Sequence, residues 1–337
     1  RNRYGGTGCI RNLVGQSSPL LPYICMDRQN APKFMNAWRI LPLGVLTLAM
    51  LLRGAAQQPT PHTTYPEHGP RIVSLSPAIT RAVADFGLDR NLVGCTPWCR
   101  AAPDGTPVVG DLHDINYEAL VRLEPTHVFL QPGRRRTPER LRELAARSDW
   151  ILRAWSLDGI EDVVTLVEDL PEALFPAADP VSTSARAEAT RRADELGAAL
   201  RGMIEPEPGI PRGRLLIVAP GPAWWAFGRG TYLADLAAAR GWASAVPERG
   251  WVELSQEDLV RLDPDAVLLV RMADGDRAAL EPAAVRLRGL GLDAAEAGRV
   301  GRLAHAEAGL PSTSLIEIAE RLGAELEDLA ADEVARD

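Results

Sequence analysis

The hydrophobic pattern of one fifteen-residue segment occurs twice in this chain. Residues 117–131 and residues 256–270 are identical at eight of their fifteen positions. In each copy, leucines recur at helical spacing, an acidic residue and a proline end the helix, and an apolar run typical of a buried strand follows. The segments 71–77 and 214–220, each an arginine followed by an apolar run and a proline, precede the two copies at similar distances. We therefore expect two α/β lobes built to one plan.

Strand patterns alternate with helix patterns through both halves, which favours parallel sheets. In the first half we predict strands at 71–75, 92–94, 108–110, 127–130 and 150–155, and helices at 78–86, 138–146 and 160–170 besides the repeat helix. In the second half we predict strands at 215–219, 266–270 and 299–303, and helices at 232–239, 279–288 and 314–322.

A long amphipathic helix separates the halves. It begins at Ser182 or Thr183 and ends near Ile204, with apolar residues on one stripe, and some 20 residues span about 30 Å. We interpret it as a rigid strut between lobes, with a crossover helix inside one lobe as the alternative. The predicted layout is a leader and signal peptide at 1–56, a flexible leader at 57–70, an N-terminal lobe at 71–180, a bridging helix at 181–205, a C-terminal lobe at 212–325 and a tail at 326–337.

Composition and charge are those of a globular protein with an unusual N-terminus. The 337 residues are 46% hydrophobic and 24% charged, which suits about two domains of ~150 residues. Of 37 basic and 45 acidic residues, seven basic and one acidic lie in residues 1–56, so the remainder carries a net charge of −14. An acidic body argues against a nucleic-acid partner.

The N-terminal bias predicts export to the periplasm. From Met35 a short charged segment precedes thirteen mostly apolar residues, Ile40–Leu52, and the small residues 54–56. This is the pattern of a cleaved signal peptide, and the apolar run is shorter than the roughly 20 residues of a membrane span. A membrane-anchoring helix is the alternative. No cysteine follows the small residues, so a bacterial lipoprotein anchor is not expected.

Two cysteines remain after the predicted cleavage, Cys95 and Cys99. Their spacing matches neither a zinc pair nor a redox pair. In an exported protein they could form a local disulfide, and one buried thiol beside one loop thiol is the other possibility.

The sequence carries no motif for catalysis. Phosphate-cradling glycine loops and the Gly-x-Ser-x-Gly elbow are missing, and nothing assembles a nucleophile, a base and an orienting carboxylate. Three histidines follow Pro70, and His127, at the start of a predicted strand, is assigned a structural role. We therefore predict a binding protein rather than an enzyme.

Several segments resemble the cobalamin/iron-siderophore periplasmic binding proteins of ABC importers. They are residues 71–80, 92–94, 109–111 and 116–128 in the first half, and 250–259 and 262–266 in the second. The resemblance covers roughly residues 70–325. It implies the helical-backbone (class III) fold, in which two Rossmann-like α/β lobes are joined by one long rigid α-helix. It also implies a monomeric receptor without a cofactor of its own that delivers a corrinoid, haem or ferric siderophore to an inner-membrane permease.

In such a fold the ligand lies between the lobes, at loops that follow the carboxyl ends of the strands. The predicted ligand-binding residues of the first lobe are Ser76, Pro77, Thr96, Trp98, Leu112, His113, Gln131 and Arg134. Those of the second lobe are Trp224, Trp225, Phe227, Trp251, Arg271 and His305, with Glu307 in the same loop as His305.

Aromatic faces suit the flat surface of a corrin, a haem or an aryl siderophore. We expect Trp98, Trp224 and Trp251 to contact ligand, and Trp150 and Trp155 to pack inside the lobe. By resemblance, Trp98 and Trp251 stand where cobalamin receptors also carry aromatics.

Two departures affect the choice of ligand. Leu112 and His113 stand where a cobalamin receptor of the family has a tryptophan. Arginines 134–136 could pair with siderophore carboxylates, or could simply be a solvated helix start.

The resemblance also implies docking to permease arginines by one acidic residue on each lobe. Glu139 is the candidate on the first lobe, and Glu281 or Asp276 on the second, although each could be a plain surface charge.

Two other functions remain open. A free metal-ion receptor of the zinc or manganese type would need converging ligands such as Asp111, His113, His305 and Glu307. An exported α/β enzyme is the third possibility.

Overall fold

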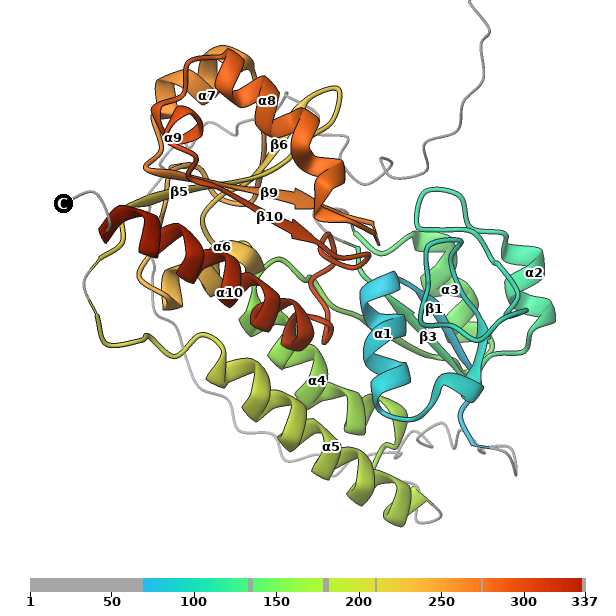
Figure 1. Cartoon of the computed structure of the whole chain (residues 1–337). Helices are drawn as coiled ribbons and strands as arrows, with labels where there is room; N and C mark the ends of the chain where they lie inside the picture. The colour runs from blue at the N-terminus through green and yellow to red at the C-terminus, as the bar shows by residue number, and fades with distance from the viewer. Residues whose placement is uncertain (1–68, 133–135, 178–181, 210, 274, 335–337) are drawn as a thin grey trace, which may run out of the picture. The chain divides into compact units, whose positions relative to one another are not determined.

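The computed structural model describes residues 69–132, 136–177, 182–209, 211–273 and 275–334 (Figure 1). The predicted signal peptide, the leader at 57–68 and Arg134 lie outside the described residues. The chain divides into a unit of residues 1–57 and a unit of residues 58–337, and both lobes belong to the second unit.

The N-terminal lobe contains a four-stranded parallel sheet in the order β2-β1-β3-β4. Its strands are β1 (Ile72–Leu75), β2 (Leu92–Gly94), β3 (His127–Leu130) and β4 (Ile151–Ala154). Strands β1 and β3 are buried at every position because helices cover both faces of the sheet, which is why they read as unbroken apolar runs. The helices of this lobe are α1 (Pro77–Asp85), the 3₁₀ turn η1 (Asp89–Asn91), α2 (Tyr117–Arg122), α3 (Glu139–Arg147) and α4 (Ile160–Leu174).

The predicted strand at 108–110 is wrong. Val108 and Gly110 make only isolated bridges, with Cys95 and Ile115 respectively. Gly110 has a φ of +87°, and a Cβ atom there would lie 2.0 Å from the carbonyl oxygen of Asp114. The Val-Gly-Asp segment therefore builds a tight turn that requires glycine, instead of extended backbone.

The C-terminal lobe has a mixed sheet in the order β10-β9-β5-β6-β8, with β7 paired to the first residues of β5. Its strands are β5 (Arg214–Ala219), β6 (Trp224–Phe227), β7 (Ala243–Ser244), β8 (Trp251–Leu254), β9 (Ala266–Arg271) and β10 (Val300–Ala304). Strands β5, β9 and β10 pair in parallel as predicted, and the two-residue strand β7, which was not predicted, pairs in parallel with β5. Strands β6 and β8 are antiparallel additions that the sequence analysis read as loops.

Helices flank the C-terminal sheet on both faces, with α6 and α10 on one face and α7, α8 and α9 on the other. They are α6 (Tyr232–Ala239), α7 (Gln256–Leu262), the 3₁₀ turn η3 (Arg277–Leu280), α8 (Glu281–Gly289), α9 (Asp293–Glu296) and α10 (Leu315–Val334). The final helix is longer than predicted. Residues up to Val334 are helical where a tail from residue 326 was expected, because Leu326 and Leu329 still pack in the core.

The sequence repeat is visible in the same hydrogen bonds in each lobe. Arg71 donates to the carbonyl oxygens of Leu123 and Glu124 at the end of α2. Arg214 donates to those of Leu262 and Asp263 at the end of α7. An arginine thus satisfies the last carbonyl groups of the repeat helix in both copies.

In the same two copies, the acidic residue that ends the helix is left-handed, with a φ of 45° at Glu124 and 42° at Asp263. The two copies therefore share an unusual backbone turn as well as their side-chain contacts.

One long helix, α5 (Thr183–Gly202), connects the lobes in the chain, and α4 lies alongside it (Figure 1). On α5, Ala189 belongs to the N-terminal core, and Leu196 and Leu200 belong to the C-terminal core. Helix α4 is divided in the same way, with Leu170 in the first core and Val163 in the second. The predicted fold, two α/β lobes joined by a long helix, is confirmed, and α4 doubles the connection.

None of the described helices combines the length and the apolarity that crossing a bilayer requires.

Candidate ligand-binding site

Three segments of the N-terminal lobe are tied together at the carboxyl end of its sheet. Ser76 follows β1, caps the start of α1 and donates to Oε1 of Gln131, which follows β3, at 2.8 Å. The Gln131 amide in turn donates to the carbonyl oxygen of Leu157 beyond β4 at 3.3 Å. Ser76 and Pro77 are buried at the helix start, and Gln131 is half-buried. The structure therefore brings these three predicted residues together at this end of the sheet. Ser76 and Pro77 are buried there, and Gln131 is partly exposed.

The loop after β2 carries Trp98 next to the buried side chains of Thr96 and Cys99. Thr96 accepts the backbone N–H of Trp98 at 3.2 Å, and its hydroxyl lies 3.1 Å from Sγ of Cys99. Trp98 is half-buried, and its Nε1 is enclosed without a hydrogen-bond partner in the part of the chain that the structure describes.

Cys95 and Cys99 are free thiols, and both are buried. Hydrogen bonds from Cys95 and from the hydroxyls of Thr80 and Thr96 lower the pKa of Cys99 to about 7 although burial opposes the shift. Each interaction favours the thiolate, so Cys99 is the more acidic of the two thiols. The sequence left open a disulfide or one buried thiol beside one loop thiol; in the structure both thiols are free and both are buried.

The aromatic residues of the C-terminal lobe divide between the two faces of its sheet. The rings of Phe227 on β6 and Trp251 on β8 lie 4.0 Å apart, and Phe227 also meets the ring of Tyr232 edge-on. These residues belong to the core that includes Ile160 at the start of α4. Trp225 alternates onto the same face and is half-buried, as is Trp251.

Trp224 points to the opposite face. It is 2% exposed and packs in the core on the face of the sheet that α7, α8 and α9 cover, which we call the outer core of this lobe. The guanidinium of Arg286 lies over its ring at 4.5 Å. Phe227, Trp225 and Trp251 are thus grouped, and Trp224 is placed apart from them as a packing residue. Trp155 packs edge-on to Phe129 and donates its indole N–H to Asp169, and Trp150 packs beside the outer core of the N-terminal lobe, so the packing roles predicted for both are confirmed.

The remaining predicted ligand residues are spread along the loops. Leu112 packs against the N-terminal core, and His113 is exposed on the turn that Asp111 stabilises. Arg271 ends β9, and its carbonyl oxygen accepts the N–H of His305 at 3.1 Å. Arg134 lies outside the described residues.

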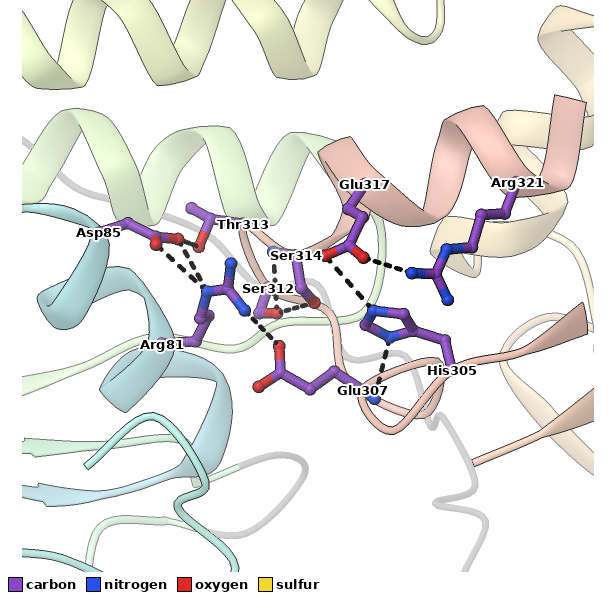
Figure 2. A network of polar contacts seen from close by, with 9 residues as sticks. All are labelled: Arg81, Asp85, His305, Glu307, Ser312, Thr313, Ser314, Glu317 and Arg321. Carbon is purple, nitrogen blue, oxygen red and sulfur yellow. Dashed lines mark hydrogen bonds and ion pairs between the residues drawn. The ribbon is translucent and has the colours of Figure 1, made fainter. Parts of the chain in front are cut away.

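A polar network joins α1 of the N-terminal lobe to the loop 305–314 of the C-terminal lobe (Figure 2). Arg81 Nη1 lies 3.2 Å from Oε2 of Glu307, and Thr313 donates to Oδ2 of Asp85. Burial lowers the pKa of Arg81, but Asp85 and Glu307 outweigh it and raise that pKa, so the guanidinium is charged.

The sequence analysis missed Arg81, Asp85 and Thr313. The four-residue spacing of Arg81 and Asp85 is visible in the sequence as a helical ion pair, 3.1 Å apart in the structure. Their partners across the network lie more than 220 residues away in the chain, and no local pattern points to them.

The four candidate metal ligands do not converge. Asp111 Oδ1 accepts the N–H groups of His113 and Asp114 in its own turn. His305 Nδ1 accepts the N–H of Glu307, and the Glu307 carboxylate pairs with Arg81. Within the described ranges, His, Cys, Asp and Glu side chains form no group of three or more that could hold a metal ion.

Two surface grooves lie at equivalent places on the two lobes. The first, about 420 Å³, is lined by Tyr117, Glu118, Val121, Arg122, Arg140 and Leu144. The second, about 440 Å³, is lined by Gln256, Glu257, Val260, Arg261 and Leu290. Four lining residues in each groove are repeat counterparts, and neither groove contains a predicted ligand-binding residue.

The two docking candidates also occupy equivalent places. Glu139 is the first residue of α3 and Glu281 the first residue of α8, the helices that follow β3 and β9. Glu139 pairs with Arg142, whereas Glu281 is held by Arg288 and Arg302, whose hydrogen bonds lower its pKa.

By sequence, neither a family model nor a curated protein matches the chain. Solved structures do match. The apo form of the periplasmic haem-binding protein RhuT from Roseiflexus sp. RS-1 is 17% identical, with a TM-score of 0.58 over 78% of this chain and 99% of that one. The periplasmic haem-binding protein HutB of Vibrio cholerae is 19% identical, with a TM-score of 0.58 over 76% and 98%. The periplasmic vitamin B12-binding protein BtuF of Vibrio cholerae is 15% identical, with a TM-score of 0.56 over 77% and 97%.

The chain has the fold of these periplasmic binding proteins. The matches extend over nearly the whole of each solved chain, so both lobes and the connecting helix are shared. At 15–19% identity the likeness concerns the fold, and it confirms at that level the resemblance found in residues 70–325.

Proposed function

We propose that this protein is an extracytoplasmic solute-binding receptor that takes a haem or a corrinoid to an ABC importer. The observation that carries the proposal is the shared two-lobed fold with periplasmic haem-binding and vitamin B12-binding proteins. The matched structures are described as binding proteins, which supports a receptor rather than an enzyme.

The aromatic placement supports a flat macrocycle as the ligand. Aromatic residues are only 5% of the chain, yet three tryptophans are half-buried: Trp98 in the loop after β2 of one lobe, and Trp225 and Trp251 on β6 and β8 of the other. A rigid ring presents a large apolar area at a small entropic cost, which suits a haem or corrin face. Arg271 at the end of β9 supplies a positive charge for a haem propionate or a corrin side chain.

A ligand panel tests this function. The purified mature protein is titrated with haemin, cyanocobalamin, a ferric siderophore and Zn²⁺, and binding is followed by tryptophan fluorescence and, for haemin, by the Soret band. Saturable one-to-one binding of haemin or cyanocobalamin is expected. Tight binding of Zn²⁺ alone would favour the metal receptor, and product formed from a candidate substrate would favour the enzyme; either result would reject the proposal.

We also propose that Glu139 and Glu281 contact the permease. Their support is their matched position, since each opens the helix after the repeat strand of its lobe. Glu139→Arg and Glu281→Arg should abolish ligand uptake by cells while ligand affinity stays unchanged. Because Glu281 also holds two arginines, thermal stability is measured for each variant. Glu118→Arg, exposed on α2, is the control, and uptake that survives both reversals would remove this assignment.

Export completes the proposed role. Cleavage after the small residues 54–56 would start the mature chain near Gln57, consistent with a periplasmic receptor. N-terminal sequencing of the periplasmic fraction checks this, and a mature chain that still begins at or before Met35 would contradict it. A monomer is expected, and its mass in solution can be measured on the same sample.

A further inference from the structure

The lobes are joined at a second place besides the helices α4 and α5. Arg81 and Asp85 on α1 contact Glu307 and Thr313 in the loop 305–314 of the other lobe (Figure 2). We call these four residues the interlobe clamp. Two separate contacts cross between the lobes here, the ion pair of Arg81 with Glu307 and the hydrogen bond from Thr313 to Asp85, so a relative movement of the lobes must break both.

The half of the clamp on the loop 305–314 is buried, and the half on α1 is partly exposed. Glu307 is 7% exposed and Thr313 is 2% exposed, and the side chains of Arg81 and Asp85 are 29% and 23% exposed. An exposed ion pair contributes little, whereas a buried carboxylate that loses its partner keeps an uncompensated charge. Arg81 is therefore the residue whose removal should disturb the contact most.

Each half of the clamp is anchored in its own lobe. On the C-terminal side, the Glu307 N–H donates to His305 Nδ1 at 3.1 Å, and the buried Tyr232 hydroxyl donates to the carbonyl oxygen of Ala308 at 2.9 Å. On the N-terminal side, Arg192 of the connecting helix donates to the carbonyl oxygen of Asp85 at 2.9 Å. The clamp thus links α1, the connecting helix α5 and the loop 305–314.

The clamp is placed to control the ligand-facing loops. Arg81 lies one helical turn after Pro77, at the start of α1, where Ser76 and Gln131 meet. On the other lobe, the loop 305–314 begins where His305 binds the end of β9. A change in clamp geometry would therefore move the loops that both lobes offer to a ligand.

We propose that the interlobe clamp fixes the separation of the two lobes and slows the release of the bound ligand. Arg81 and Glu307 act as positioning residues, since their charged groups pair with each other across the two lobes. The inference rests on the proposed receptor function for its ligand arm, whereas its structural arm requires no ligand.

The structural arm is a double-mutant cycle followed by amide hydrogen exchange. The variants are Arg81→Met, Glu307→Gln and the double variant in the ligand-free protein. Arg81→Met should speed exchange in α1 and in residues 305–314 by about tenfold, because it leaves Glu307 buried and unpaired. The double variant should exchange more slowly than Arg81→Met, since the buried carboxylate of Glu307 is then removed together with its partner, and Asp85 keeps the hydrogen bond from Thr313.

A matched pair inside one lobe is the control. Arg122 and Glu118 form an exposed ion pair at 2.6 Å on α2, so Arg122→Met and Glu118→Gln remove the same charges without touching the clamp. Exchange in α1 and in residues 305–314 should not change in these controls. Additive effects in the clamp cycle, or equally faster exchange in α2 and β3, would show general destabilisation and overturn the proposal.

The ligand arm measures haemin and cyanocobalamin kinetics on the same variants. Arg81→Met should raise the dissociation rate about tenfold and change the association rate much less, because the bound state loses the constraint. Unchanged dissociation from a variant whose exchange is faster would overturn the role in release. If neither macrocycle binds the parent protein, the receptor proposal fails, and the exchange cycle still decides whether the clamp holds the lobes.

Discussion

Each lobe has its own sheet, and the two sheets have the same arrangement of four core strands but differ at one edge. In the N-terminal lobe the order is β2-β1-β3-β4, and the corresponding strands of the C-terminal lobe are arranged as β7, β5, β9 and β10. Only the C-terminal lobe adds β6 and β8, which pair antiparallel beyond β5. Trp224, Trp225, Phe227 and Trp251 all lie on these two added strands.

Residues that both lobes need for folding are thus distinct from residues that only one lobe carries and that are predicted to bind the ligand. The shared part contains the arginine, Arg71 or Arg214, that donates to the last carbonyl groups of the repeat helix. It also contains the buried leucine of that helix and the buried strand after it. Each satisfies the same packing or hydrogen-bonding need in both lobes. The added strands are not needed to complete the common sheet, and they carry most of the aromatic residues predicted to meet the ligand.

The largest expected effect tests the shared core. Leu120 and Leu259 are repeat counterparts, and both are 0% exposed. Leu120→Ala and Leu259→Ala should each lower the free energy of unfolding by about 2–5 kcal/mol, since each removes buried methyl groups and leaves a cavity. Urea denaturation measures both. Val121→Ala and Val260→Ala, where both valines are 46% exposed, should stay within about 0.5 kcal/mol.

A cost at one leucine but not at the other would mean that the two cores are not equivalent.

The next effect is a pH dependence that belongs to one lobe. His127 is fully buried at the start of β3, and burial lowers its pKa to about 4, whereas the repeat counterpart is Ala266. In the unfolded chain, His127 binds a proton below its ordinary pKa of about 6.5. In the folded chain, it does not bind that proton until about pH 4. The stabilising contribution of neutral His127 should therefore be fully present above pH 6.5. The free energy of unfolding should fall by up to about 3 kcal/mol as the pH decreases toward 4.

Denaturation curves at several pH values check this, with His127→Gln as the comparison. The variant should lose stability less steeply between pH 6.5 and 4. An equal slope in both proteins would assign the pH dependence to other groups.

The third prediction concerns the aromatic edge. Replacing both Trp98 and Trp251 by Ala should weaken binding of haemin or cyanocobalamin more than tenfold, or about 1.4 kcal/mol, because two ring surfaces are lost. Trp224→Phe is the matched control, since Trp224 lies on the other face of the sheet in the outer core. It should alter stability and leave affinity within about twofold. Equal losses of affinity would place Trp224 at the ligand after all.

The smallest effect concerns the shared arginines. Arg71→Met and Arg214→Met remove hydrogen bonds to the last carbonyl groups of α2 and α7. Each should cost about 1 kcal/mol, and Arg71 should cost more, because it is half-buried whereas Arg214 is exposed. Thermal unfolding measures both, with the exposed Arg122→Met as the control. A larger loss of stability at Arg214 would show that the two arginines do not stabilise their helix ends in the same way.

Local patterns predicted most of the fold because its elements are set by short-range chemistry. The repeat helices, their acidic-proline ends and the buried strands β3 and β9 follow from apolar spacing and from residues within one segment. Strands β6 and β8 were missed because they pair antiparallel with β5 and with each other, outside the alternation of helices and parallel strands from which the other strands were predicted. The end of α10 was missed because Leu326 and Leu329 are held by tertiary packing.

The candidate site was predicted less completely than the fold. Ser76, Gln131, Phe227 and Trp251 were named from their positions, and the structure pairs Ser76 with Gln131 and Phe227 with Trp251. Trp224 and Trp225 are neighbours in sequence, and only strand pairing decides that their side chains point to opposite faces.

The sequence by itself determined that the chain has two similar α/β halves with a long helix between them, because a repeat and a helical stripe are properties of consecutive residues. Tertiary structure alone decided which aromatic residues are grouped and that Arg81 meets Glu307, since such contacts depend on how distant segments fold together. The physical reason is that backbone propensity acts over a few residues, whereas the burial of a charge or a ring is a property of the assembled lobes.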